Sequence, residues 1–145
     1  MFKHVLIPTD GSELSKVAIE KGLQLAKVLN ARVTGLYVMP QYHVFSYHTE
    51  MLSDTAAQFD GHIREHAEMY LAALGQAAAA AGVACETTAT QHDHPFESII
   101  ETAAKRGCDV IVMSSHGRSG MRGLLLGGET QKVLTHSKVP VLVLR

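Results

Sequence analysis

The stretch of sequence that decides the fold is Val110-Ile111-Val112-Met113-Ser114-Ser115-His116-Gly117-Arg118-Ser119-Gly120-Met121-Arg122-Gly123-Leu124-Leu125-Leu126-Gly127-Gly128-Glu129-Thr130. Its first four residues are apolar and predict a buried strand, and the segment from Glu129 to His136 predicts a helix. A glycine-rich loop therefore joins a strand to a helix. Glycine lets the backbone approach a ligand closely, and the unpaired N–H groups at a helix start attract phosphate. Because Arg118 and Arg122 precede any acidic residue here, we expect an anion-binding loop; the alternative is a glycine-rich turn without a ligand.

The composition is typical of a globular protein with one domain over residues 1–145, since 46% of the residues are hydrophobic and 19% are charged. A net charge of −1 gives no reason to expect nucleic acid or an acidic membrane as a partner. No apolar run approaches the roughly 20 residues of a membrane helix, and the apolar start is too short for a signal peptide. Cys85 and Cys108 lack metal-ligand spacing, so we expect reduced, buried thiols in a cytoplasmic protein.

Hydrophobic periodicity predicts strands and helices in strict alternation. A helix is expected between a capping Ser12 and a terminating Asn30, with Leu14, Ala18, Leu25 and Leu29 at helical spacing. The predicted strands are Val5–Ile7, Ala31–Val38, Val83–Thr90, Val110–Met113 and Val139–Leu144, and the later predicted helices are Asp54–Ala81, Asp93–Gly107 and Glu129–Ser137.

This alternation predicts a parallel sheet that is covered by helices on both faces. Ligands of such sheets bind beyond the carboxyl ends of the strands, where the strand order reverses. The loops after the first, second and fourth strands are therefore candidates for a site. The segment His43–His48 has no clear pattern, and we leave open whether it forms a lid or a dimer contact.

Three segments together resemble the universal stress protein family over nearly the whole chain. They are Val5–Ser12, Ser115–Gly120 followed by Leu124–Gly127, and Val139–Val143. The resemblance implies a single-domain α/β fold, a Rossmann-like three-layer α/β/α sandwich akin to the adenine nucleotide alpha hydrolases, with a five-stranded parallel sheet of order 3-2-1-4-5. It also implies a homodimer paired through the C-terminal strand Val139 to Leu144.

One branch of that family binds ATP through the pattern G-x-x-G, nine residues, then G-S or G-T. Gly117 and Gly127 keep the long spacing, but Ser114 replaces the first glycine and Gly128 replaces the hydroxyl residue. Thr130 is a possible substitute for that hydroxyl, whereas Glu129 would repel a triphosphate if it pointed inward. We therefore expect weaker or altered binding of ATP or another adenine nucleotide rather than none.

The resemblance also implies which residues bind the nucleotide. Asp10 is additionally implied to hold Mg²⁺ through water, although the same carboxylate could simply fix the Asp-Gly-Ser turn. The implied nucleotide-binding residues are Pro8, Thr9 and Asp10 beside the adenine and ribose, Val38 beside the base, Met113, Ser114, His116, Gly117 and Arg118 beside the ribose and first phosphate, and Gly127, Gly128, Glu129 and Thr130 beside the phosphates.

Other sites find little support in the sequence. There is no P-loop lysine motif and no dinucleotide fingerprint after the first strand, which argues against an ordinary NTPase or an NAD enzyme. His62 and His66 are spaced as zinc ligands, but no third ligand is identifiable, and an exposed helix face is favoured. Ser115, His116 and Asp10 lack a nucleophile elbow, so a hydrolase is disfavoured.

Two functions remain from the sequence alone. The favoured one is a stress-response regulator that binds an adenine nucleotide and hydrolyses it slowly at most, because no charge-neutralising lysine is evident. The alternative is a family member that binds no nucleotide and acts as a dimeric protein-interaction module.

Overall fold

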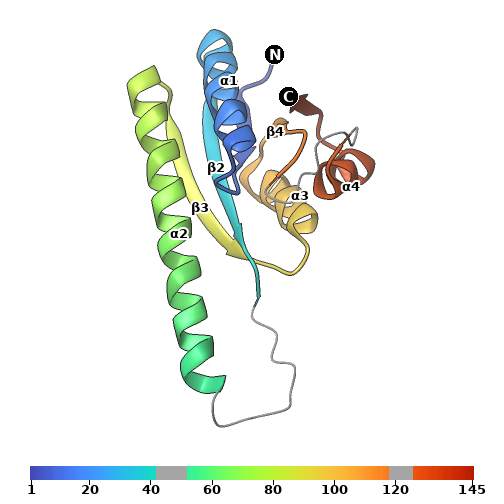
Figure 1. Ribbon diagram of the computed structural model, residues 1–145. Coiled ribbons are helices and arrows are strands. Elements are labelled where there is room, and N and C mark those ends of the chain that lie inside the picture. The colour runs from blue at the N-terminus through green and yellow to red at the C-terminus, as the bar shows by residue number, and fades with distance from the viewer. Residues whose placement is uncertain (42–51, 118–125) are drawn as a thin grey trace.

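Five parallel strands form one sheet of order β3-β2-β1-β4-β5, as predicted. The computed structural model describes residues 1–41, 52–117 and 126–145, and Figure 1 shows the alternation of strands and helices. The His43–His48 segment and Arg118 lie outside the described residues. The elements are β1 (His4–Pro8), α1 (Glu13–Leu29), β2 (Arg32–Met39), α2 (Leu52–Ala81), β3 (Cys85–Gln91), α3 (Pro95–Arg106), β4 (Val110–Ser114), α4 (Gly128–His136) and β5 (Val141–Leu144).

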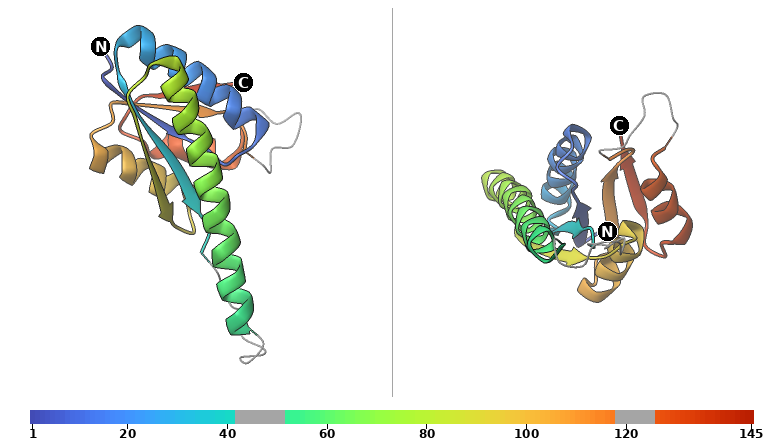
Figure 2. Two further views of the ribbon diagram at one scale, coloured as in Figure 1. Left: turned by 90° about the vertical axis from the view of Figure 1, so that its left-hand side faces the viewer. Right: turned by 60° about the horizontal axis from the view of Figure 1, so that its bottom comes forward.

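Helices cover both faces of the sheet, as the right-hand view of Figure 2 shows. Side chains of β1 alternate between the two faces, because successive residues of a strand point in opposite directions. Val5 and Ile7 belong to the core beneath α1 and α2, while Leu6 belongs to the core beneath α3 and α4. All three side chains are fully buried, so β1 is the centre of the three-layer sandwich.

Local chemistry sets the ends of α1 where the sequence placed them. The Ser12 hydroxyl accepts a hydrogen bond from the amide of Ser15 at 3.2 Å, and Asn30 ends the helix in the left-handed conformation with φ 50°. Of the predicted apolar face, Ala18 is fully buried, but the expectation was wrong for Leu14, which is 37% exposed. The buried face also carries the small residues Ser15 and Gly22. A Cβ on Gly22 would lie 2.7 Å from Cδ1 of Ile7. The helix α1 therefore packs so close to β1 that its buried face has room for small side chains at this point.

Two strands are shorter than the sequence predicted at their starts. β3 begins at Cys85 rather than Val83, and β5 begins at Val141 rather than Val139. β3 is an edge strand with exposed residues along its length, so it is not apolar on both faces. Cys85 is accordingly only half-buried, whereas Cys108 is buried; both are free thiols, and the expectation of two buried cysteines was wrong for Cys85.

A buried polar chain lies at the amino ends of the strands, on the side away from the predicted loops. His4 is 3% exposed, and its Nε2 lies 2.7 Å from the hydroxyl oxygen of Thr34. Thr34 donates its own proton to Glu86 at 3.0 Å, so its oxygen must accept from His4. Nε2 of His4 therefore carries a proton. Burial lowers the pKa of His4 below 6.5, and the nearby charge of Arg32 lowers the pKa further.

The long helix α2 extends past the end of the sheet (Figures 1 and 2). Its C-terminal half supplies Leu74 and Ala78 to the core beneath α1 and α2. Within the described residues, no helix combines the length and the apolar character that crossing a membrane requires.

Candidate functional site

A cavity of about 490 Å³ opens where the strand order reverses beside β1. The loops that follow β1, β2 and β4 meet there, because the strands are parallel and their carboxyl ends share one edge of the sheet. The cavity is lined by Pro8, Thr9, Asp10, Ser15, Tyr37, Val38, Pro40, Ile63, His66, Pro95, Ile99, Met113, Ser114, His116, Gly117, Leu126, Gly127, Gly128, Glu129 and Thr130.

The structure brings together every predicted nucleotide-binding residue that it describes. Each of them lines the cavity, and Arg118 alone lies outside the described residues. The sequence did not point to two lining residues from α2, Ile63 and His66, or to two from α3, Pro95 and Ile99. No sequence signal could have found Ile63 and His66, because their place at the cavity depends on how α2 packs beside the sheet.

The loop after β1 is held rigid by its own side chains. Asp10 Oδ1 accepts from the amide of Ser12 at 2.9 Å, and the hydroxyl of Thr9 accepts from the amide of Gly11 at 3.2 Å. The predicted role of Asp10 in fixing the Asp-Gly-Ser turn is thus confirmed. Gly11 has φ +78°, and an added Cβ there would overlap the ring of Tyr70 on α2. Glycine is therefore required at the point where α2 crosses this loop.

Hydrogen bonds join the two ends of the loop after β4. The amide of Gly127 donates to the carbonyl of Ser115 at 2.7 Å, and the hydroxyl of Thr130 donates to the carbonyl of Ser114 at 3.0 Å. The hydroxyl of Ser114 donates to the carbonyl of His116 at 2.8 Å. These three donors satisfy protein carbonyls, and the phosphate contacts implied for Gly127 and Thr130 stay predictions.

The first-turn amides of α4 remain as donors at the cavity. Within the described part of the chain, the amides of Gly128, Glu129 and Thr130 have no acceptor. Such amides carry the partial positive charge of a helix N-terminus. They give the cavity one place that suits an anionic group.

Glu129 is fixed by two partners on different elements. Its Oε2 accepts from the amide of Phe96 at 2.9 Å, and its Oε1 lies 3.0 Å from Nζ of Lys132. The carboxylate therefore caps the N-terminus of α3, for which the preceding His94 supplies no side-chain bond. The sequence could not reveal this, because Phe96 and Glu129 meet only through the packing of α3 beside α4.

His116 lies at the near end of the loop and is half-buried. Its Nδ1 is 3.1 Å from the hydroxyl of Ser115, and its Nε2 is buried without a hydrogen-bond partner. The hydrolase that the sequence disfavours finds no support here either, because Ser115 is 3% exposed and does not line the cavity. A nucleophile in that position would be out of reach of a substrate.

The histidine pair on α2 does not assemble a metal site within the described residues. His62 and His66 are both exposed, and Nδ1 of His62 lies 3.9 Å from a carboxylate oxygen of Glu65. No group of three or more metal-ligating side chains occurs among the residues that the structure describes.

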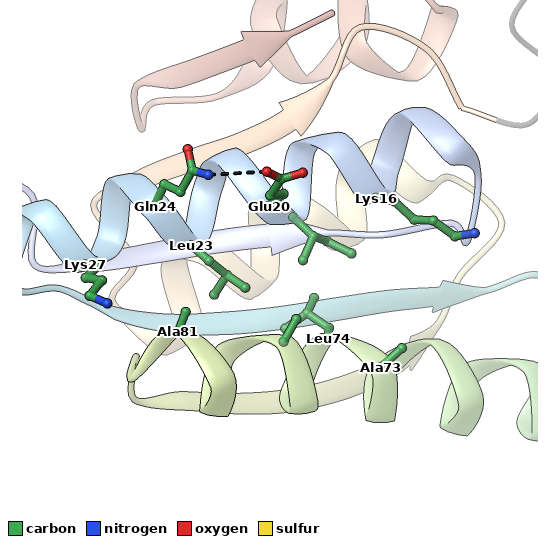
Figure 3. Close-up of a pocket in the computed structure, with 10 residues that line it drawn as sticks. Lys16, Glu20, Leu23, Gln24, Lys27, Ala73, Leu74 and Ala81 are labelled. Atoms are coloured by element: carbon green, nitrogen blue, oxygen red, sulfur yellow. Dashed lines mark hydrogen bonds between the residues drawn. The ribbon is translucent and has the colours of Figure 1, made fainter.

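A second hollow of about 430 Å³ lies between α1 and α2 (Figure 3) and contains none of the predicted residues. Its floor is apolar, with Leu23 from α1 and Leu74 from α2 among the residues that line it. Some polar groups of α1 on its rim have partners, since Lys16 lies 2.6 Å from Glu13 and Gln24 donates to Glu20 at 3.3 Å. It is a groove between packed helices and lacks the convergent polar groups of the first cavity.

Comparison with known proteins now decides the family. The model of the universal stress protein family matches residues 1–145. The chain belongs to the universal stress protein family. The predicted resemblance is therefore confirmed.

Relatives and solved structures agree with this membership. Universal stress protein YxiE of Bacillus subtilis is 30% identical over 149 residues that span the whole of both chains. Universal stress protein MJ0531 of Methanocaldococcus jannaschii is 28% identical over 145 residues, covering 100% of this chain and 83% of the relative.

Two solved structures share the fold of this universal stress protein at 26% identity. Protein MJ0577 of Methanocaldococcus jannaschii superposes with a TM-score of 0.80, covering 99% of this chain and 96% of that chain. A universal stress protein crystallised in complex with cAMP superposes with a TM-score of 0.73, covering 99% of this chain and 97% of that chain.

Proposed function

We propose that this universal stress protein binds an adenine nucleotide in the cavity beside β1 and acts as a stress-response regulator. The observation that carries the proposal is that the motif residues of the loops after β1 and β4 line one cavity of about 490 Å³. That volume lies in the range of small-molecule sites, which is about 300–1,000 Å³. The open amides of Gly128, Glu129 and Thr130 supply donors for a phosphate at one end.

The remaining walls suit a base and a ribose. Val38, Ile63, Ile99 and Met113 give the cavity apolar surface, and Thr9 and Asp10 add polar groups at its edge. Asp10 is also the candidate for holding Mg²⁺ through water when a nucleotide brings the ion. The related structure in complex with cAMP supports an adenine ligand for this fold.

The proposal is tested by filling the cavity. Val38 is half-buried and lines it, so Val38→Trp should place an indole in the space of the ligand and weaken binding at least tenfold. Val28 lies on α1 and is 85% exposed, which makes Val28→Trp the matched control. Binding is measured by isothermal titration of AMP, cAMP and ATP against each protein.

Wild-type and Val28→Trp proteins should bind at least one of these nucleotides with equal affinity. Absence of binding by the wild type up to millimolar concentration would contradict the proposal and favour the interaction-module alternative. Equal binding by Val38→Trp and the wild type would show that the ligand occupies another place.

We also infer a homodimer paired along β5. β5 is an edge strand with an unpaired side, and its Leu142 is 40% exposed. Leu142→Asp should convert a dimer to a monomer in light scattering after gel filtration. Leu134 on α4 is 41% exposed, so Leu134→Asp is the control and should remain dimeric. A dimer that persists in Leu142→Asp would contradict pairing through β5.

A further inference from the structure

The placement of Glu129 at the phosphate end of the cavity has a consequence for ligand choice. We propose that the cavity selects adenine ligands that carry a single phosphate group over ATP, and that Glu129 is the residue that sets this preference. The inference rests on the proposed nucleotide-binding function and goes beyond it by naming the ligand class.

The carboxylate of Glu129 is a fixed part of the cavity wall. It is held by the amide of Phe96 at 2.9 Å on one oxygen and by Lys132 at 3.0 Å on the other. The two partners belong to different helices, so swinging the side chain away would break a bond to the start of α3 and an ion pair on α4. Glu129 therefore keeps its negative charge beside the first turn of α4, where phosphates would bind.

A second carboxylate lies on the other side of the same loop. Asp10 lines the cavity, and its Oδ2 lies against the backbone of Gly117. Asp10 and Glu129 are the acidic residues among the described lining residues. A monophosphate ester carries about two negative charges near neutral pH, a cyclic monophosphate fewer, and ATP more. Repulsion by the carboxylate of Glu129 therefore grows with each phosphate that is added.

Lys132 offsets the charge of Glu129 only in part. Lys132 does not line the cavity, and its side chain is 48% exposed. Ion pairs with this exposure are screened by water and contribute little. The carboxylate therefore still acts on a ligand inside the cavity.

Some hydrogen-bond donors at the phosphate end are already engaged by the chain. The amide of Gly127 and the hydroxyls of Ser114 and Thr130 are bonded to protein carbonyls. The amides of Gly128, Glu129 and Thr130, which lie within one helical turn, have no acceptor among the described residues, and neither have those of His116 and Gly117. One tetrahedral anion can occupy the first turn of α4.

The test compares AMP, cAMP and ATP by isothermal titration at constant ionic strength, with EDTA present so that no divalent cation masks the charge. The wild type should bind AMP or cAMP at least tenfold more tightly than ATP, and the better of the two identifies the open or the cyclic phosphate. Glu129→Gln keeps an oxygen for the amide of Phe96 and removes the charge, so the preference should fall below about threefold through tighter ATP binding.

Two further variants complete the experiment. Glu97 is not among the residues that line the cavity, so Glu97→Gln, which removes a charge from the first turn of α3, should leave the preference unchanged. Lys132→Met removes the cation beside Glu129 and should widen the preference, which keeps the inference testable if Glu129→Gln fails to fold.

Wild-type protein that binds ATP as tightly as AMP and cAMP would overturn the inference and leave the proposed function standing. An unchanged preference in Glu129→Gln would overturn the role of that residue. Failure to bind any of the three would instead contradict the proposed function itself.

Discussion

Gly117 is the position at which one added methyl group should uncouple the two loops of the site. A Cβ at Gly117 would overlap Oδ2 of Asp10. Its backbone is not among those with positive φ in the described chain, so an alanine there meets no conformational penalty of that kind. The effect of Gly117→Ala should therefore come from displacement of the Asp10 carboxylate.

The size of the effect follows from what Asp10 holds. Its Oδ1 accepts from the amide of Ser12 at 2.9 Å, and a hydrogen bond to a charged group contributes about 1.5–3 kcal/mol. Allowing for partial recovery by movement of the side chain, Gly117→Ala should lower the free energy of unfolding by about 1–3 kcal/mol. For a protein of this size the melting temperature should fall by roughly 2–10 °C. Affinity for nucleotide should fall as well, because both Asp10 and Gly117 line the cavity.

The assay is a double-mutant cycle measured by urea unfolding. Asp10→Ala removes the carboxylate that the new methyl group would strike, so Gly117→Ala should cost less than about 0.5 kcal/mol in that background. Gly128→Ala is the matched control in the same loop, because an added Cβ there meets nothing within 4 Å. Its unfolding free energy should stay within about 0.5 kcal/mol of the wild type.

Equal costs of Gly117→Ala in the wild-type and Asp10→Ala backgrounds would refute the reasoning. So would a loss at Gly128→Ala as large as that at Gly117→Ala, since the effect would then belong to any side chain in the loop.

Three further predictions concern the body of the fold. Leu74 is fully buried against Gly35 of β2, so Leu74→Ala should lower the unfolding free energy by about 2–5 kcal/mol in urea, and a loss below about 1 kcal/mol would contradict its place in the core. Burial raises the pKa of the Cys108 thiol to about 11, so iodoacetamide at pH 8 should modify Cys108 only when the protein unfolds. Equal rates of modification for Cys108 and a short thiol peptide, measured by mass spectrometry, would contradict this. Because the pKa of His4 is lowered in the folded protein, the unfolded chain binds more protons than the folded protein below about pH 6.5. The contribution of His4 to the free energy of unfolding should therefore be complete above that pH and decline as the pH falls. His4→Gln should flatten this decline, and an unchanged slope would exclude His4 as its cause.

The sequence predicted the layout of the molecule well because local patterns carry it. Apolar runs such as Val110–Met113 and helical periodicity such as that of the third helix depend on neighbours along the chain, and they placed nearly every element within a few residues. The capping of α1 by Ser12 is likewise a local hydrogen bond that residue type alone indicates. The strand order came from the family resemblance, and the topology confirms it.

The candidate site was predictable as far as its residues lie at strand ends. Asp10 follows β1, Val38 lies near the end of β2, and Gly117 follows β4. Because the strands are parallel, all three residues lie at one edge of the sheet. Their nucleotide contacts, the cytoplasmic location and the Mg²⁺ role of Asp10 stay predictions. The hydrogen bonds of the Gly127 amide and the Thr130 hydroxyl across the loop could not be predicted, because they depend on how its two ends approach.

By itself, the sequence determined the alternation of strands and helices, the family, and which loops carry the site residues. Each of these depends on patterns and motifs of residues that are close together in the chain. Only the tertiary structure decided that Ile63 and His66 of α2 reach the cavity and that Glu129 caps α3. Those contacts join residues tens of positions apart in the chain, and they exist only once the helices pack on the sheet and fix the distances between them.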